Sequence, residues 1–229
     1  MSGSNDRKCG VCGASVRAVF RAPQPEIAPD LDMRPGEPAR STLTEWIQVC
    51  SSCRAAAPDL VLLPPTTRAV VDSDDYKALT TSALEETLPF RRWALICERN
   101  GDRLNQAEAL LQAAWAADDA AEMTEASRLR LEVAALWDGT EDVELSLRRL
   151  DVLRRAGAFA EADAWADRLR QRCDEETAQT IIRFQRAQIA ARDIGRHLIS
   201  SALPPPAHAP HVSHGKRAST GFWSRLLKK

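Results

Sequence analysis

The sequence predicts a mostly α-helical protein that begins with a small β zinc ribbon. Three observations support this fold class. Two Cys-x-x-Cys pairs stand near the N-terminus, proline nearly vanishes after residue 72, and helix-breaking residues then recur at short intervals. We therefore expect a zinc-ribbon module, a linker, an antiparallel helical array and a disordered tail, at residues 1–57, 58–72, 73–200 and 201–229.

The four cysteines of the two pairs carry the clearest chemistry. Cys9 and Cys12 form one pair, Cys50 and Cys53 form the other, and 37 residues separate the pairs. Four thiolates brought together make the closed ligand shell of a structural Zn²⁺ site, so we predict zinc as the cofactor. Iron of the rubredoxin type is an alternative, because four thiolates bind either metal. A thiol oxidoreductase is a further alternative, although that chemistry uses a single pair at a helix N-terminus.

Between the two pairs the sequence predicts two strands joined by a long loop. Polar and apolar residues alternate over 15–20 and again over 42–49, which is the pattern of half-buried strands. Five prolines in residues 21–40 exclude a helix there. Within this loop, Asp30, Asp32 and Arg34 place two carboxylates next to a guanidinium. They predict a loop fixed by an Arg34–Asp ion pair, or alternatively a binding contact beside the zinc.

The region after residue 72 is rich in Ala, Leu, Glu and Arg, and its breakers divide it into seven helices. Glycines 101 and 139 stand where left-handed residues end helices, and Pro89 suits a first turn. Thr140 and Asp174 are expected as N-caps. Four tryptophans, at 93, 115, 137 and 165, are interpreted as core anchors, and Cys97 and Cys173 as small buried residues. The predicted helices are 73–86, 89–100, 103–117, 120–137, 141–156, 159–172 and 175–199.

One predicted helix pair resembles a tetratricopeptide repeat. Residues 143–169 place Gly157 at the turn between two helices and Ala162 at the small-residue position where such helices touch, and residues 99–116 are more loosely similar. The helical array is therefore expected to be tetratricopeptide-like.

The chain as a whole resembles an uncharacterised bacterial family that pairs an N-terminal four-Cys zinc ribbon with tetratricopeptide-like helices. The residues that carry the resemblance are Cys9–Gly13, Asp30–Pro35, Arg40–Thr42, Trp46–Cys50 and Ala114–Asp119. The second pair departs from the usual pattern, since Arg54 follows the last cysteine where glycine is common. The resemblance implies no known reaction.

Charge is distributed unevenly along the chain. The formal net charge is −1, yet residues 73–199 hold 18 basic and 24 acidic side chains, and residues 200–229 hold five basic and none acidic. A body with a negative balance is a poor general binder of nucleic acid, so nucleic acid is an unlikely partner.

The first residues, Met1–Gly10, are polar and contain no apolar signal-peptide core, and the chain has no apolar run long enough to span a membrane. Clustered thiols in such a chain predict a reducing, cytoplasmic location.

The C-terminal segment ends in a short amphipathic stretch. Phe222, Trp223, Leu226 and Leu227 would form one apolar stripe on a helix, with cations opposite. This stripe predicts docking into a protein groove or weak contact with an anionic membrane, and an inert, frayed terminus is the alternative. His208, His211 and His214 lie before it in a proline-rich segment that reads as a linker.

No catalytic constellation is present in the sequence. It contains no Gly-rich phosphate loop, no Gly-x-Ser-x-Gly and no His-Glu-x-x-His. We therefore expect a non-enzymatic scaffold or adaptor for a protein partner of unknown identity. A nucleic-acid-associated zinc-ribbon regulator and the thiol oxidoreductase are the alternative functions.

Overall fold

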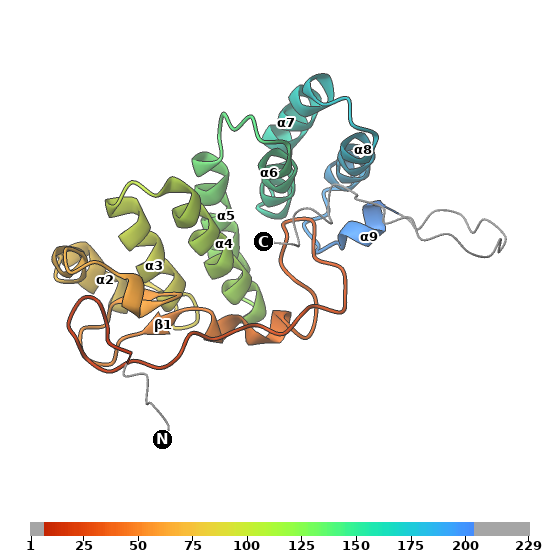
Figure 1. Cartoon of the computed structure of the whole chain (residues 1–229). Helices are drawn as coiled ribbons and strands as arrows, with labels where there is room; N and C mark the ends of the chain where they lie inside the picture. The colour runs from red at the N-terminus through yellow and green to blue at the C-terminus, as the bar shows by residue number, and fades with distance from the viewer. Residues whose placement is uncertain (1–6, 204–229) are drawn as a thin grey trace, which may run out of the picture.

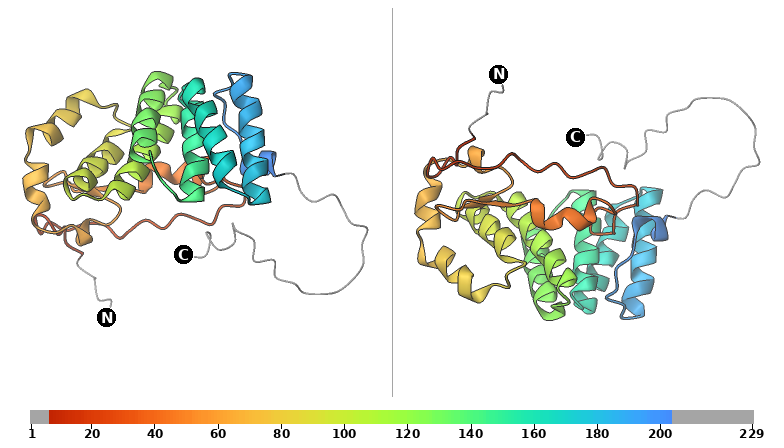
Figure 2. Two further views of the ribbon diagram at one scale, coloured as in Figure 1. Left: turned by 90° about the horizontal axis from the view of Figure 1, so that it is seen from above. Right: turned by 90° about the horizontal axis from the view of Figure 1, so that it is seen from below.

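A computed structural model of the chain describes residues 7–203. In this part, the protein is mostly helical with one small two-stranded antiparallel sheet, as the sequence predicts. The longer helices stand side by side in a curved row, and the N-terminal segment runs along one side of that row (Figures 1 and 2). The predicted stripe of Phe222, Trp223, Leu226 and Leu227, like the rest of residues 204–229, lies outside the described residues.

Consecutive helices of the row pack against each other, and α6 also contacts α8. Three of the turns between them contain a glycine with positive φ, at Gly101, Gly139 and Gly157, which is the conformation that ends a helix. Pro89 lies in the first turn of its helix, as expected. The helices are α1 Thr67–Val71, α2 Asp74–Ser82, α3 Leu88–Arg99, α4 Arg103–Asp119, α5 Met123–Leu136, α6 Val143–Arg155, α7 Phe159–Arg172, α8 Glu176–Ala190 and α9 Ile199–Ala202.

The main hydrophobic core runs along the row. Trp115, Trp137 and Trp165 are buried in it and Trp93 packs against it, which confirms their interpretation as core residues. Between α6 and α7, Ala162 is completely buried. A small side chain at this position lets the two helices approach closely, because close-packed interiors leave no room for a larger one.

The N-terminal segment contains less strand than predicted. Residues 15–20 form only an isolated bridge, between Ser15 and Lys8. Within 42–49, a 3₁₀ helix (η1, Arg40–Glu45) replaces most of the expected strand, and β1 is only Gln48–Val49, paired with β2 at Ala56–Ala57. The reason is local: the Trp46 indole donates to the Thr42 hydroxyl at 3.0 Å, a contact that a helical turn permits and a strand does not.

The predicted linker is structured. It forms a second 3₁₀ helix (η2, Leu60–Leu62) and α1, and it buries Leu60, Leu63 and Val71. Two predicted caps are wrong. Asp142 caps α6 in place of Thr140, and α8 begins after Glu175, so Asp174 caps no helix.

The last long helix is shorter than predicted. α8 ends at Ala190, and Arg192 then adopts a positive φ. Residues 193–199 run instead along the proline-rich loop, where the Leu31 amide donates to the His197 carbonyl at 3.0 Å and the Ile199 amide to the Pro29 carbonyl at 2.9 Å. His197 therefore does not end a helix. These backbone bonds join the N-terminal segment to the far end of the row.

Candidate metal centre

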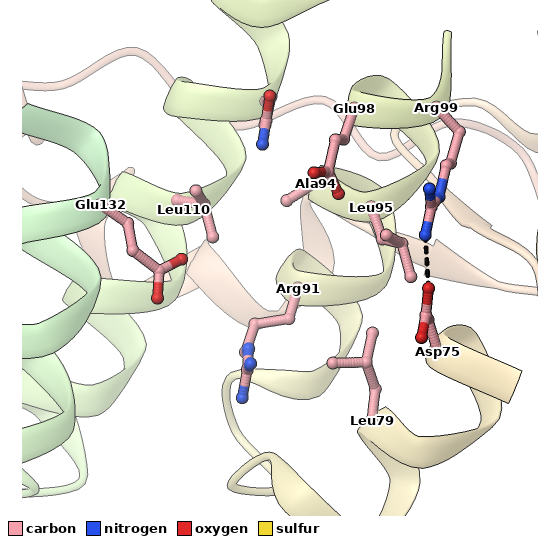
Figure 3. A pocket seen from close by; sticks show the side chains of 10 residues that line it. Asp75, Leu79, Arg91, Ala94, Leu95, Glu98, Arg99, Leu110 and Glu132 are labelled. Atoms are coloured by element: carbon pink, nitrogen blue, oxygen red, sulfur yellow. Dashed lines mark hydrogen bonds and ion pairs between the residues drawn. The ribbon is translucent and has the colours of Figure 1, made fainter. Parts of the chain in front are cut away.

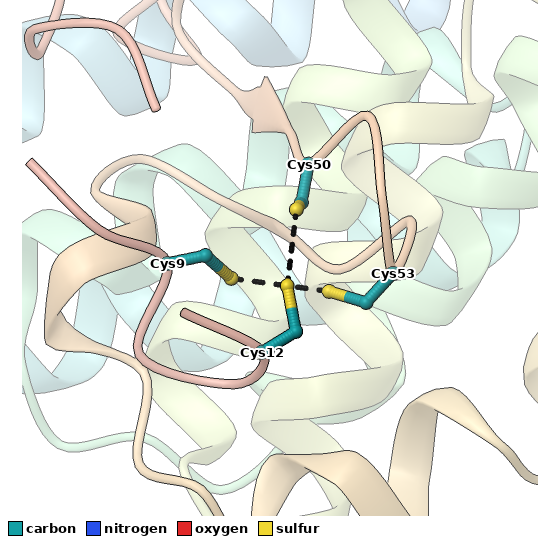
Figure 4. A group of neighbouring side chains, drawn as sticks. All are labelled: Cys9, Cys12, Cys50 and Cys53. Atoms are coloured by element: carbon teal, nitrogen blue, oxygen red, sulfur yellow. Dashed lines mark hydrogen bonds between the residues drawn. The ribbon is translucent and has the colours of Figure 1, made fainter. Parts of the chain in front are cut away.

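The two Cys-x-x-Cys pairs meet at one point. All four sulfur atoms lie within 4.8 Å of one another and face a common centre (Figure 4). The Sγ atoms of Cys9 and Cys53 are 3.8 Å apart, and those of Cys12 and Cys50 are 3.7 Å apart. A tetrahedral site with Zn–S bonds of 2.3 Å has sulfur–sulfur edges of about 3.8 Å, whereas a disulfide needs about 2.05 Å. The arrangement therefore fits a four-thiolate metal site.

Backbone hydrogen bonds build both pairs in the same way. The Cys9 amide donates to the Ala14 carbonyl and the Cys50 amide to the Ala55 carbonyl, both at 2.8 Å. Each bond closes a turn of six residues around two sulfur atoms. The two halves of the site are thus related by sequence spacing and by conformation.

Both turns need one residue in the left-handed region. Gly13 has φ 74° and Arg54 has φ 66° at the equivalent position. Glycine adopts this conformation freely, but arginine does so at a cost. The hydroxyl of Tyr76, on α2, donates to the Arg54 carbonyl at 2.9 Å and holds the strained turn in place. This hydrogen bond from α2 therefore offsets part of the cost of having arginine where the common Cys-x-x-Cys-Gly pattern has glycine.

The surroundings shift the pKa values of Cys9, Cys12 and Cys53 in different directions. A hydrogen bond from the Ala14 backbone lowers the pKa of Cys12 to about 7, while burial raises the pKa of Cys9 and that of Cys53. Four thiolates so close together repel one another unless a cation compensates them. Metal binding supplies that cation and releases the protons.

The first pair is fixed to the linker by very close contact. The Gly10 amide donates to the Leu60 carbonyl at 2.9 Å, and a Cβ at Gly10 would lie 1.9 Å from the Leu63 carbonyl oxygen. Only glycine fits there. Arg7 adds two hydrogen bonds to Asp59, at 2.7 and 2.6 Å.

Cys9 and Cys50 are buried in a second hydrophobic cluster that includes Tyr76 and Ile96 of the helical row. The metal centre is thus part of the packing of α1–α3. A metal ion bound by all four thiolates would have a closed tetrahedral shell, which suits a structural role. Cys97 and Cys173 do not join it; both are buried as expected, and burial raises the pKa of Cys97 to about 12.

The acidic loop contacts the helices rather than the cysteines. The Trp115 indole donates to Asp32 at 2.8 Å, and Arg155 donates to the same carboxylate at 2.9 Å. The Arg34 guanidinium forms an ion pair with Asp119 at the end of α4. The loop is therefore fixed by arginine pairs, as one reading of the sequence predicts, but the partner of Arg34 is Asp119 and not a loop aspartate. Two of the segments behind the family resemblance, Asp30–Pro35 and Ala114–Asp119, meet at this point.

A second feature is a recess of about 360 Å³ among α2, α3, α4 and α5. Leu79, Leu95 and Leu110 point into it, while charged side chains surround them (Figure 3). Sequence periodicity did not reveal this recess, because its residues come from four helices. The full lining is Asp75, Leu79, Arg91, Ala94, Leu95, Glu98, Arg99, Gln106, Leu110 and Glu132.

Comparison with known protein families, with curated proteins and with solved structures finds no match to this chain. The resemblance to a bacterial family, and the tetratricopeptide-like character of the helices, therefore stay predictions. Within residues 7–203, every helix is too short or too polar to cross a membrane.

Proposed function

We propose that this protein is a non-enzymatic interaction scaffold, in which a structural Zn²⁺ on Cys9, Cys12, Cys50 and Cys53 fixes the start of a helical array that binds a protein partner. The recess among α2–α5 supports this function. It has an apolar floor and a charged rim, and peptide-binding grooves on helical proteins combine the same two features.

The location of the proposed binding surface follows from the packing of the N-terminal loop. In an array of helix hairpins, the inner face is the usual place for a bound peptide. Here the loop occupies the side of the row formed by α4 and α6, where it contacts Trp115 and Arg155. Gln106 and Leu110 lie on the other side of α4, about half a turn around the helix from Trp115, and both line the recess.

Affinity capture from an extract of the native host tests this proposal, with the zinc-loaded chain as bait. Leu79→Arg places a long cation in the recess. Leu104→Arg is the matched control, because Leu104 is 61% exposed and lies outside the recess. We expect a protein that is retained by the wild type and by Leu104→Arg but lost with Leu79→Arg, at unchanged zinc content. The proposal fails if no protein is retained reproducibly, or if the two variants behave alike.

A further inference from the structure

Buried arginines are common in this protein, and one of them lacks a counter-charge. Seven arginines are less than a tenth exposed within the described residues. Six of these form an ion pair with a carboxylate. Arg92 on α3, which is 4% exposed, forms none with any described residue. The paired six are Arg34, Arg130, Arg148, Arg149, Arg154 and Arg155.

The Arg92 guanidinium is nevertheless held in a defined position. One nitrogen, Nη2, donates to the Thr80 hydroxyl at 2.8 Å, and the group lies over the Tyr76 ring at 5.4 Å from the ring centroid. Its Nε is buried and has no hydrogen-bond partner. A buried cation without an anion is costly, because burial removes its hydration and returns no ion pair.

Arg92 lines a recess of about 360 Å³ between α1, α2, α3 and the turn at Cys53, which shares no lining residue with the recess described above. Arg54 and Lys77 line it too, and within the described residues neither of them forms an ion pair. Thr80 and Ser52 add hydroxyl groups. The lining is Ser52, Cys53, Arg54, Arg68, Val71, Asp72, Tyr76, Lys77, Thr80 and Arg92.

The one carboxylate that lines this recess is already paired with a different cation. Asp72 accepts from Arg68 at 2.6 Å. Burial lowers the pKa of Arg92. Within the described residues, no carboxylate forms an ion pair with Arg54, Lys77 or Arg92.

We propose that this recess binds a phosphate group, with Arg92 as the buried anchor and Arg54 and Lys77 as the cations at its mouth. Three cations without a carboxylate partner favour an anion with more than one negative charge, and phosphate carries about −1.5 to −2 at neutral pH. The planar guanidinium binds such oxyanions through two parallel hydrogen bonds. A simple carboxylate would leave two of the three cations without a partner.

The test is isothermal titration of the full-length, zinc-loaded protein with sodium phosphate, against sodium chloride of equal ionic strength. Arg92→Met should weaken phosphate binding at least about tenfold, because a hydrogen bond to a charged group contributes more than one factor of ten. Lys77→Gln, an exposed substitution that leaves the core intact, should weaken it about two- to fivefold. Arg99→Gln is the matched control, since Arg99 is also on α3 but pairs with Asp75 outside this recess.

Two further ligands test which kind of anion the recess binds. O-phosphoserine tests whether the phosphate belongs to an ester, and acetate tests a singly charged anion. Saturable binding of inorganic phosphate or of phosphoserine, lost in Arg92→Met and retained in Arg99→Gln, supports the proposal, and the tighter of the two ligands identifies the source. The proposal is overturned if neither phosphate ligand binds above chloride, if acetate binds as tightly, or if Arg92→Met and Lys77→Gln both bind as the wild type does.

Discussion

Replacement of Asp32 by Asn tests how the N-terminal loop is attached to the helical row. Asp32 is completely buried and accepts from the Trp115 indole, the Arg155 guanidinium and the Arg34 amide. Asn keeps the size of the side chain and removes the charge. Breaking a buried ion pair costs about 3–5 kcal/mol. Arg155 keeps a second partner, Asp118, at 2.6 Å. We therefore expect the free energy of unfolding to fall by about 3 kcal/mol, the lower end of this range.

The pH dependence of this loss identifies its cause. Burial by itself raises the pKa of Asp32, but Arg155 and Arg130 outweigh it, and the pKa in the folded protein lies below its ordinary value. The charged carboxylate therefore stabilises the fold above the pKa of the unfolded chain, near 3.9. This contribution is lost as the pH falls through the lower folded pKa. The difference in unfolding free energy between the wild type and Asp32→Asn should thus have its full size at pH 7 and decrease below about pH 4.

Urea unfolding at several pH values, followed by circular dichroism, measures this difference. Asp75→Asn is the control, because Asp75 forms an exposed pair with Arg99 and such pairs contribute only about 0–1 kcal/mol. Protonation of the thiols at low pH affects all three proteins equally. The reasoning is refuted if Asp32→Asn costs no more than Asp75→Asn, or if its cost is the same at every pH.

Three other substitutions test the metal centre and the helix packing. Cys50→Ser should abolish the binding of one Zn²⁺ per chain, measured by elemental analysis, and should lower the stability of α1–α3, because Cys50 is buried in their shared core; metal retained by the variant would contradict the ligand assignment. Arg54→Gly should stabilise the zinc-loaded protein by about 1 kcal/mol in thermal unfolding, since it removes the cost of a left-handed arginine; a loss of stability would mean that this side chain matters more than its backbone strain. Ala162→Leu should cost about 1–3 kcal/mol through overpacking, and an unchanged midpoint would show that the α6–α7 contact adapts freely.

Much of the fold follows from local sequence patterns. The Cys-x-x-Cys spacing indicates which four cysteines meet, because a two-residue gap is sufficient to bring two sulfur atoms together. The helix ends at Gly101, Gly139 and Gly157 follow from the backbone freedom of glycine. Most of the predicted strand at 42–49 is wrong, because alternation does not distinguish a strand from a short 3₁₀ helix that buries Leu43; only Gln48–Val49 is a strand.

Other features depend on contacts between distant residues, which local patterns do not encode. The loop carboxylates are visible in the sequence, but Asp32 finds its partners 83 and 123 residues away. The early end of α8 also depends on distant contacts. Residues 193–199 form backbone hydrogen bonds with the loop, and these bonds could not form if the helix continued. The unpaired Arg92 is recognised only when the partners of the other buried arginines are known.

The contact of residues 29–34 with α6 and with residues 197–199 has a consequence for biosynthesis. A ribosome adds about 5–20 residues per second. Asp32 therefore leaves the ribosome roughly 6–25 seconds before Arg155, 123 residues later. During that interval its charge must stay in water, and the helices α3–α5 can assemble without the loop. The loop completes its ion pairs only after α6 has emerged, and its backbone bonds to residues 197 and 199 form last. Nascent chains released before residue 199 should consequently leave this loop open to proteases, while complete chains protect it.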